Sequence, residues 1–314
     1  MNSTWSQRGT LILVVAAMIL PSPAAEDSTT QRPPAWIAEY GYQPQDLAEF
    51  AFGAPGVPEV PIVTVTIQGS PFPLVLDTGT KGYAALDSDV IARLQLPVKG
   101  WDTWLDSSGK PVARIPRATV PSLQFGPIHL TGAEVTGMGP ESIMGKRIGY
   151  VGTLGWWSFR DYRITLDYAN RRIALSRSPL PPQLQSCATR YVTRFVSPSD
   201  LDGLILVEGT VSGKPIYLEV DTGKSNTELD PKIQAIREFK QESQGYVIDG
   251  ITVGPFVVQS RFGRMFGGFE GFNRGLDKPV YVGLGSDFLK NFLLTIDYPS
   301  HRVVFEQKPC EPSP

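Results

Sequence analysis

The stretch VDTGKSN (residues 220–226) repeats the Asp-Thr-Gly of an earlier stretch, LVLDTGTKG (residues 74–82). A single Asp-Thr-Gly is more typical of a turn than of a functional site, because all three residue types favour turns. Here, however, the residues upstream of the two motifs also match without a gap when Asp77 is aligned with Asp221. The identical pairs are Gly69 and Gly213, Pro71 and Pro215, and Leu74 and Leu218. We infer that the chain contains one structural unit twice.

Both copies of the unit are predicted to begin with a β-hairpin that leads into the Asp-Thr-Gly. In each copy, runs rich in β-branched residues flank a Gly-containing turn, VTVTIQGSPFPLVL in the first and LILVEGTVSGKPIYLEV in the second. A second match follows downstream, where residues 152–175 align with residues 282–305. Each of these segments predicts a short helix and then two strands joined by a tight turn. We expect the shared Tyr168 and Tyr298 to serve that turn, without a catalytic part.

The repeats define the predicted domain organisation. The first unit covers residues 58–178 and the second covers residues 200–308, and the Pro-rich segment 179–199 links them. Together they predict a mainly β fold, with two β lobes related by a pseudo-twofold axis and with short helices. Residues 26–57 form an N-terminal extension, for which a removable prosegment and an ordinary extension both stay open, and residues 309–314 form a tail.

The two units differ in the segment after the motif. Each motif is followed by a predicted short helix, in DSDVIARLQL and in DPKIQAIREF, but the first unit then has about fourteen residues more than the second. Much of this surplus falls in GWDTWLDSSGKPVARIP (residues 100–116). This segment predicts a long hairpin with its turn at Ser107, Ser108 and Gly109.

Composition and charge narrow the functional classes. With 41% apolar and 19% charged residues the chain is that of an ordinary globular protein, and its 31 glycines and 28 prolines favour strands and turns over helical bundles. The net charge is only −2 and no run of Lys or Arg is present, which argues against a nucleic-acid partner. The two histidines, His129 and His301, do not support a Ser-His-Asp triad or a zinc site, so we expect no metal and no cofactor.

The N-terminal segment predicts export. Arg8 precedes an apolar run, LILVVAAMIL (residues 11–20), and small residues follow it, as in a secretory signal peptide spanning residues 1–25. The run is short for a membrane span, so we expect no stable span after cleavage, although an uncleaved anchor stays open. The predicted location is therefore periplasmic or secreted. In such a compartment the two cysteines, Cys187 and Cys310, predict one disulfide bond.

Two carboxylates brought together by a repeat have a specific chemistry. Because they cannot easily both ionise, Asp77 and Asp221 would share one proton and titrate as a coupled pair. Such a pair can hold a water molecule, whose proton one carboxylate takes during attack on a carbonyl group while the protonated partner polarises that carbonyl. The expected supporting residues are Thr78 and Thr222, which can hydrogen-bond across the pair, and Gly79 and Gly223, which let the backbone approach the carboxylates.

On these motifs the chain resembles the aspartic proteases of the retropepsin and pepsin superfamily, and more narrowly bacterial exported aspartyl-protease-like proteins with two retropepsin-like halves. Each half has the order typical of that family: a hairpin into Asp-Thr-Gly, a short helix, a strand pair and a hydrophobic-hydrophobic-Gly turn. That turn is residues 153–155 in the first half and residues 283–285 in the second, where Gly283 departs from the hydrophobic preference. The resemblance covers residues 58–308 and implies a bilobed pepsin-like acid protease fold.

The resemblance also implies a proteolytic function. It makes Asp77 and Asp221 the catalytic pair of an aspartic-type endopeptidase, a hydrolase that binds an extended peptide or protein substrate by strand addition in a cleft between the lobes. It assigns the long hairpin of the first half to a flap over the substrate. The candidate substrate contacts are Trp104 or Trp101 and the turn residues Ser107, Ser108 and Gly109, although packing of either Trp on its own lobe stays open. We expect the protein to be a monomer.

Lys224 is the departure at the site, because the family usually has Ser, Thr or Ala at this position and Thr80 complies in the first half. An ammonium group that points inward could lower the pKa of the pair and confine activity to more acidic conditions. A flexible Lys could instead point to solvent and leave the pair unaffected. Lys224 thus keeps a second hypothesis open, a catalytically silent, bilobed peptide-binding protein that has kept the fold. The two intact Asp-Thr-Gly motifs favour the enzyme.

Overall fold

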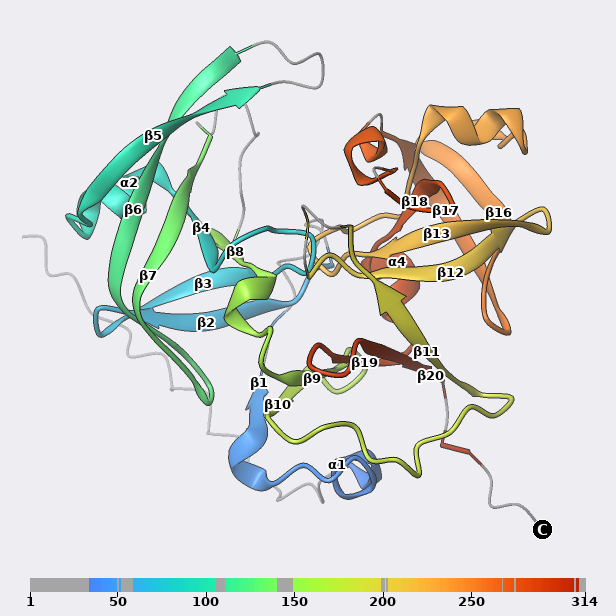
Figure 1. The fold of residues 1–314 in the computed structure, drawn as a ribbon, viewed down its shortest axis with the longest axis horizontal. Coiled ribbons are helices and arrows are strands. Elements are labelled where there is room, and N and C mark those ends of the chain that lie inside the picture. The colour runs from blue at the N-terminus through green and yellow to red at the C-terminus, as the bar shows by residue number, and fades with distance from the viewer. Residues whose placement is uncertain are drawn as a thin grey trace, which may run out of the picture. The chain divides into compact units, whose positions relative to one another are not determined.

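The computed structural model describes residues 34–49, 51, 59–105, 111–139, 149–198, 201, 203–266, 268–273, 275–307 and 309–310. The signal peptide predicted at residues 1–25 and the hairpin turn predicted at residues 107–109 lie outside these ranges. The described chain is mainly β, with two separate sheets and few short helices, which confirms the predicted fold class. Figure 1 follows it from α1 in blue to β20 in red.

The first sheet has seven strands in the order β2-β3-β8-β4-β7-β6-β5, and a further pairing of β2 with β6 closes it on itself. Within it β3 runs parallel to β8, so the two strands end at the same edge of the sheet. The strands are β2 (Ile62–Ile67), β3 (Ser70–Leu76), β4 (Ala84–Asp87), β5 (Val98–Leu105), β6 (Pro111–Phe125), β7 (Ile128–Met138) and β8 (Gly152–Leu154). Two short helices accompany them, α2 (Ser88–Arg93) and η2 (Trp156–Ser158).

One part of the second sheet has the same strand order, β12-β13-β18-β14-β17-β16-β15, with a matching pairing of β12 with β16. In this order β13 takes the place of β3, and β18 that of β8. The repeat in sequence is therefore also a repeat in topology. The strands are β12 (Leu206–Val211), β13 (Lys214–Val220), β14 (Glu228–Leu229), β15 (Gln241–Glu242), β16 (Gly245–Val253), β17 (Phe256–Met265) and β18 (Val280–Leu284). The helices here are η3 (Pro231–Ala235), η4 (Phe269–Asn273) and α4 (Ser286–Leu289).

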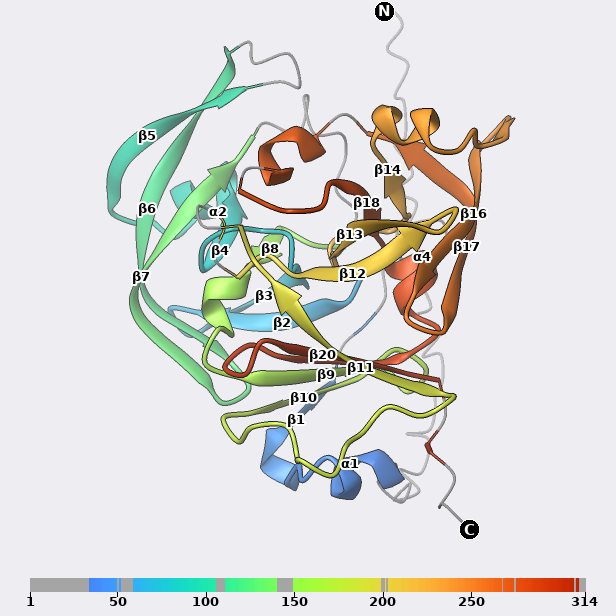
Figure 2. The same cartoon turned by 45° about the vertical axis from the view of Figure 1, so that its right-hand side comes forward.

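The rest of the second sheet is a central section in which both repeats take part, ordered β1-β10-β9-β19-β20-β11. At its middle β9 and β19 run antiparallel with Thr165 opposite Thr295, and the Oγ1 atoms of these two residues are 2.6 Å apart. Its strands are β1 (Leu47–Glu49), β9 (Arg163–Asp167), β10 (Arg172–Ser176), β11 (Arg190–Val196), β19 (Leu293–Asp297) and β20 (Arg302–Glu306). Figures 1 and 2 both show β9, β10 and β20 between α1 and the strands β2 and β12.

Residues 35–49, which the sequence assigns to an extension, pack on this central section. They form α1 (Ala35–Glu39), η1 (Pro44–Asp46) and β1, which pairs with β10. The side chain of Trp36 is buried, and its Nε1 donates a hydrogen bond to Asp167 Oδ2 at 2.8 Å. Similarly, β11 lies inside the segment predicted as a linker and pairs with β20. Each repeat therefore has one more strand at its start than the sequence alignment reveals.

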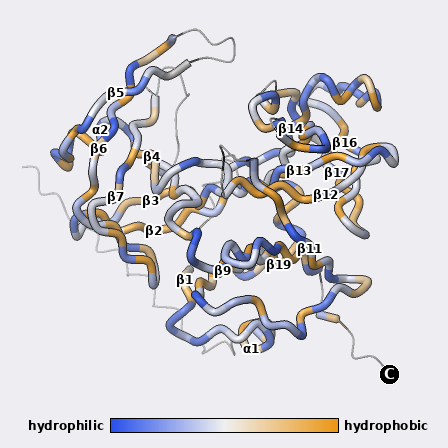
Figure 3. The backbone as a smooth tube through the Cα atoms, in the orientation of Figure 1, coloured by the Kyte–Doolittle hydropathy of each residue, from blue (hydrophilic) through white to orange (hydrophobic). Residues whose placement is uncertain are grey.

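A large hydrophobic core includes buried residues of both sheets and holds the strands in place. The strands form because apolar side chains alternate with more polar ones: in β2 the residues at 63, 65 and 67 are buried, whereas Thr64 is exposed and Thr66 half-buried. Figure 3 shows the hydrophobic residues along β2 and β12. A second cluster, around Trp36, Tyr40 and Val304, joins α1 to the central section. The core therefore fixes the ends of β3 and β13, where the two motifs begin.

The predicted helices after the motifs differ from each other in type. α2 forms in the first repeat, where it buries Val90 and Ile91. In the second repeat the segment is the 3₁₀ helix η3, which buries only Ile233. So short a segment with one anchoring side chain suits the tighter 3₁₀ geometry, which occurs mostly in short pieces.

The length difference between the repeats is located in one hairpin. β5, which pairs with β6, has eight residues, whereas its counterpart β15 has only two. Cys187 and Cys310 form the predicted disulfide bond, which ties the segment before β11 to the residues after β20. In the part of the chain that the structure describes, no helix is long and apolar enough to cross a membrane.

Candidate active site

The two Asp-Thr-Gly motifs lie in matching loops at the ends of β3 and β13. Asp77 follows β3, and its backbone N–H donates a hydrogen bond to the carbonyl oxygen of Leu154 in β8 at 3.0 Å. Asp221 follows β13, and its N–H donates to the carbonyl oxygen of Leu284 in β18 at 3.1 Å. Each motif therefore lies beside the Gly-containing turn of its own repeat.

The two threonines join the loops through reciprocal hydrogen bonds. The hydroxyl of Thr78 donates to the carbonyl oxygen of Val220 at 2.8 Å and accepts from the N–H of Thr222 at 3.0 Å. The hydroxyl of Thr222 donates to the carbonyl oxygen of Leu76 at 2.7 Å and accepts from the N–H of Thr78 at 3.1 Å. Both side chains are fully buried. Because each hydroxyl bonds to the backbone of the other loop, the threonines fix the two Asp residues relative to each other.

The two glycines place the carboxyl groups next to each other. A Cβ atom at Gly79 would overlap the carboxyl oxygens of Asp221, and a Cβ atom at Gly223 would overlap the carboxyl group of Asp77. Each carboxyl group thus lies directly against the backbone of the opposite loop. The two carboxyl groups that the sequence separates therefore lie close together in the folded chain.

Asp77 is surrounded by neutral donors. Its Oδ1 accepts from the N–H groups of Gly79 and Thr80 at 2.8 and 3.0 Å, and its Oδ2 accepts from the hydroxyl of Thr80 at 2.7 Å. The hydroxyl of Thr153 donates in turn to that of Thr80 at 3.1 Å. Burial, and then the negative charge of Asp221, raise the pKa of Asp77 to about 7, against the opposing effect of the Thr80 and Gly79 hydrogen bonds. Asp77 can therefore hold a proton up to near-neutral pH.

Asp221 is bound by a cation instead. Its Oδ1 accepts from the N–H of Gly223 at 2.9 Å, and its Oδ2 lies 2.9 Å from Nζ of Lys224. Of the two orientations considered for Lys224, the structure has the inward one. Burial would lower the pKa of the ammonium group, but the attraction of Asp221 and two further carboxylates raises it well above its ordinary value.

The pKa of Asp77 lies above its ordinary value although Lys224 points inward. The pKa of Asp77 is raised, because burial and the charge of Asp221 are the largest influences on it. The ammonium group of Lys224 is itself surrounded by negative charge, since it contacts Glu219 and lies 3.8 Å from Glu228 as well as 2.9 Å from Asp221. These three carboxylates offset much of its positive charge and so weaken its attraction for Asp77.

Glu219 and Glu228 are members of the site that the sequence analysis missed. Glu219 lies two residues before Asp221 on β13 and is only 1% exposed. Burial, and then the charge of Asp221, raise its pKa to about 7, while Lys224 opposes the shift. A signal was present in the sequence, because Glu219 interrupts the apolar strand of the second hairpin and Lys224 follows five residues later. A charged residue inside a buried strand requires a partner.

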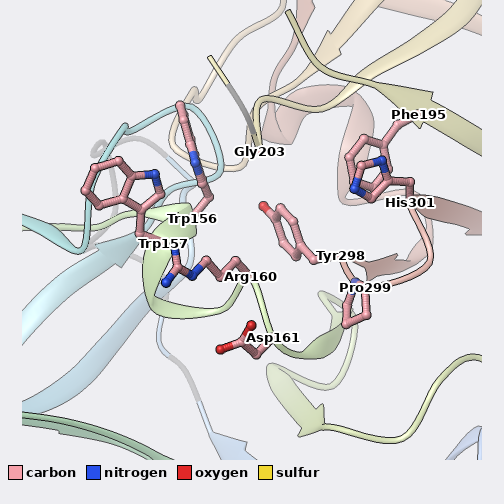
Figure 4. A pocket seen from close by; sticks show the side chains of 9 residues that line it. All are labelled: Trp156, Trp157, Arg160, Asp161, Phe195, Gly203, Tyr298, Pro299 and His301. Carbon is pink, nitrogen blue, oxygen red and sulfur yellow. The ribbon is translucent and has the colours of Figure 1, made fainter. Parts of the chain in front are cut away.

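Tyr298 is buried and lines a pocket of about 210 Å³. Burial, and then the charges of Asp77 and Asp221, raise the pKa of Tyr298 well above its ordinary value, so the phenol stays neutral. Figure 4 shows it with Trp156, Trp157 and the other lining residues, which do not include Asp77 or Asp221. Tyr298 does take part in the turn between β19 and β20, where its carbonyl oxygen accepts from the N–H of His301 at 3.1 Å.

The residues predicted to contact a substrate are only partly described. Ser107, Ser108 and Gly109 lie outside the described residues, as does the side chain of Trp104. Trp101 is 53% exposed on β5, and the guanidinium group of Arg114 lies over its ring at 5.4 Å. Within the described ranges, no cluster of three or more His, Cys, Asp or Glu side chains is arranged to hold a metal ion.

Comparison with known protein families gives a match for the first repeat, in the region that carries the first motif. Residues 63–151 match the aspartyl protease family. This aspartyl protease domain begins in β2 and ends just before β8, so it contains Asp77, whereas Asp221 lies beyond it. A comparison with curated proteins gives no match. Asp221 is joined to the aspartyl protease domain by the repeated strand order and by the hydrogen bonds of Thr78 and Thr222.

Proposed function

We propose that the protein is an aspartic endopeptidase that hydrolyses peptide bonds with the Asp77 and Asp221 pair. The observation that carries this proposal is the reciprocal bonding of Thr78 and Thr222, which holds two Asp-Thr-Gly loops in one symmetric arrangement. A structural turn motif has no need of a second copy bound to it in this way. The match of residues 63–151 to the aspartyl protease family supports the same chemistry.

The reaction follows from the two carboxyl groups. A water molecule held between them loses a proton to the ionised carboxylate as its oxygen attacks the peptide carbonyl carbon. The protonated carboxyl group donates its hydrogen to the carbonyl oxygen, which becomes a hydroxyl group. The tetrahedral species then breaks its C–N bond, and the leaving amine takes a proton from the carboxyl group that received it from water. The hydroxyl group formed on the carbonyl oxygen returns its proton to the other carboxylate as the C=O bond re-forms. The raised pKa of Asp77, about 7, supports the presence of one protonated carboxyl group from acid to near-neutral pH.

The substrate is proposed to be an extended peptide or protein segment that lies between the two repeats and pairs with strand edges. The long β5–β6 hairpin of the first repeat would cover it as a flap, as its length relative to β15 suggests. We further propose that the protein acts as a monomer in the periplasm or outside the cell, after removal of residues 1–25. The disulfide bond between Cys187 and Cys310 supports an oxidising location.

A second candidate function is a peptide-binding protein without catalysis. The observation that favours it is the contact of Lys224 with Asp221. The ammonium group binds Oδ2 of Asp221, whereas in the first repeat the hydroxyl of Thr80 binds Oδ2 of Asp77. If that contact removes the basicity that a carboxylate needs to accept a proton, the fold retains its binding surface only.

One experiment separates the two functions. A mixed peptide library is incubated with the full chain from acid to neutral pH, and new termini are identified by mass spectrometry. We expect cleavage that a statine-type inhibitor blocks and that both Asp77→Asn and Asp221→Asn abolish. Asp249→Asn is the matched control, because Asp249 is an exposed carboxylate of the second sheet that pairs with Arg237. Binding of library peptides without any cleavage across the pH range would establish the silent binder instead.

A further inference from the structure

Four equivalent positions around the pair differ together between the repeats. The alignment of Asp77 with Asp221 makes Val75 equivalent to Glu219, and Thr80 equivalent to Lys224. The strand pairings supply two more equivalences, because Ala85 of β4 faces Thr153 of β8 just as Glu228 of β14 faces Gly283 of β18. Where the first repeat has apolar or hydroxyl side chains, the second has a Glu, a Lys, a second Glu and a Gly.

The residues at these positions bind the Asp of their own repeat in different ways. In the first repeat a chain of hydroxyl groups runs from Thr153 to Thr80 and on to Asp77 Oδ2. In the second repeat Lys224 Nζ contacts Asp221 Oδ2 at 2.9 Å, is ion-paired with Glu219 and lies 3.8 Å from Glu228. The side chains of Lys224, Glu219 and Glu228 are 18%, 2% and 14% exposed, so this cluster of charges is largely enclosed.

Gly283 makes room for the cluster. A Cβ atom there would lie 2.8 Å from Glu219 Oε2 and 2.9 Å from Lys224 Nζ, closer than side-chain contacts allow. This explains why Gly283 departs from the hydrophobic residue that is usual at its turn position. Lys224 Nζ also lies over the ring of Phe269, 5.4 Å from its centre. The four residues that differ from the first repeat therefore contact one another, and Glu219, Glu228 and Gly283 together allow Lys224 its position.

The charges around the cluster come from every neighbouring element. Those nearest Lys224 are Asp221, Glu219 on β13 and Glu228 on β14, and Arg264 on β17 acts on Glu228. The titratable groups that interact with Asp221 are Asp77, Tyr168 and Tyr298. Of the two Asp residues, only Asp221 has the ammonium group as a direct partner, and Asp77 has a hydroxyl group in the same place. Because a cation stabilises a neighbouring carboxylate far more than a neutral hydroxyl does, the two Asp residues are not equivalent.

We propose that Lys224 keeps the negative charge of the pair on Asp221, so that the shared proton lies on Asp77, and that Glu219 and Glu228 hold Lys224 in this position. This assignment rests on the proposed hydrolytic function and divides its two roles. Asp221 takes the proton from water as the C–O bond forms, and Asp77 gives its proton to the carbonyl oxygen. When the C–N bond breaks, the amine takes the proton from Asp221, and Asp77 regains a proton from the hydroxyl group formed on the substrate. Lys224, Glu219 and Glu228 are positioning residues, because none of them touches the reacting atoms.

The proton assignment is measured by NMR titration of protein labelled with ¹³C at the Asp carboxyl carbons. Asp77→Asn and Asp221→Asn identify the two signals. In the wild-type protein we expect the step near neutral pH to shift the Asp77 signal at least threefold more than the Asp221 signal. In the nearly isosteric double variant Glu219→Gln/Lys224→Met, we expect the two signals to shift by similar amounts.

A second cluster variant shows whether the result could come from misfolding of the first. Glu219→Val, Lys224→Thr, Glu228→Ala and Gly283→Thr together copy the first repeat and leave no buried charge unpaired, so the same equalisation is expected. Lys278→Met is the matched control, because Lys278 also pairs with two carboxylates, Asp277 and Glu208, and lies over an aromatic ring, that of Tyr217. It should leave the wild-type pattern unchanged.

The titration and a cleavage assay together distinguish failure of the proton assignment from failure of the hydrolytic function. If the Asp77 signal dominates in the wild type but no peptide is cleaved, the proton assignment stands and the hydrolytic function is wrong. If peptides are cleaved, we also expect the basic limb of the kcat/KM profile to move by at least half a pH unit in both cluster variants, and to stay fixed in Lys278→Met. Equal shifts of the two signals in the wild type, or an unchanged Asp77 preference in the cluster variants, would overturn the proposal.

Discussion

Removing one hydroxyl group from the threonine pair should destabilise the fold strongly, and by the same amount in either repeat. Thr78→Val keeps the shape of the side chain but leaves the N–H of Thr222 and the carbonyl oxygen of Val220 without their partner. Each unsatisfied buried polar group costs about 1 to 3 kcal/mol, so the free energy of unfolding should fall by about 2 to 6 kcal/mol. Thr222→Val leaves the N–H of Thr78 and the carbonyl oxygen of Leu76 without theirs, and predicts the same loss.

The assay is urea unfolding monitored by tryptophan fluorescence. Thr64→Val is the matched control, because Thr64 is exposed on β2 and the same substitution there should change the free energy of unfolding by less than about 0.5 kcal/mol. A large loss in only one of the two threonine variants would refute the symmetric arrangement. Losses below about 1 kcal/mol in both would show that the hydroxyl groups do not hold the loops together.

Three further predictions concern pH, packing and the disulfide bond. Because the pKa values of Asp77 and Glu219 are raised to about 7 in the folded state, the folded protein binds more protons than the unfolded chain, and stability should fall as the pH rises from about 4 to about 7. Glu219→Gln should reduce that fall by up to roughly 3 kcal/mol in urea titrations at several pH values, and an unchanged slope would contradict the assigned shift. Gly79→Ala and Gly223→Ala should each lower kcat at least about tenfold, because a methyl group would overlap the opposite carboxyl group. Displacement of a reacting group by about 1 Å can lower a rate by far more than that. Full activity in a steady-state assay would show that the loops can move to make room for the methyl group. Cys187→Ser/Cys310→Ser should lower the free energy of unfolding by about 2 to 5 kcal/mol, and equal denaturation curves for the variant and the wild type would refute it.

Several strands could be predicted from the sequence because the repeat shows in identities such as Gly69 with Gly213. Two matching hairpins and two matching strand pairs are enough to place β2, β3, β9 and β10 and their counterparts. The first strand of each repeat was missed, because β1 and β11 share no motif that the alignment detects. They take part through backbone pairing with β10 and β20, which depends little on side-chain identity.

The site could be predicted only in its symmetric part. Asp77 and Asp221 follow from the motif, and the structure places the threonines and glycines beside them. The orientation of Lys224 could not be predicted, since a Lys beside a carboxylate can equally well extend into solvent. It is decided by Glu219, Glu228 and Gly283, which lie on three different strands and meet only in the folded chain.

The most direct test of the central claim is the kcat/KM of one cleaved peptide, measured for the wild type, Asp77→Asn, Asp221→Asn and the double variant. If the two residues act as one hydrolytic unit, each single substitution should lower kcat/KM at least about a thousandfold, within the range expected for loss of acid-base catalysis. The double variant should then be no worse than either single variant. Retention of substantial activity in Asp221→Asn, or losses that multiply in the double variant, would contradict the claim that Asp77 and Asp221 form one site.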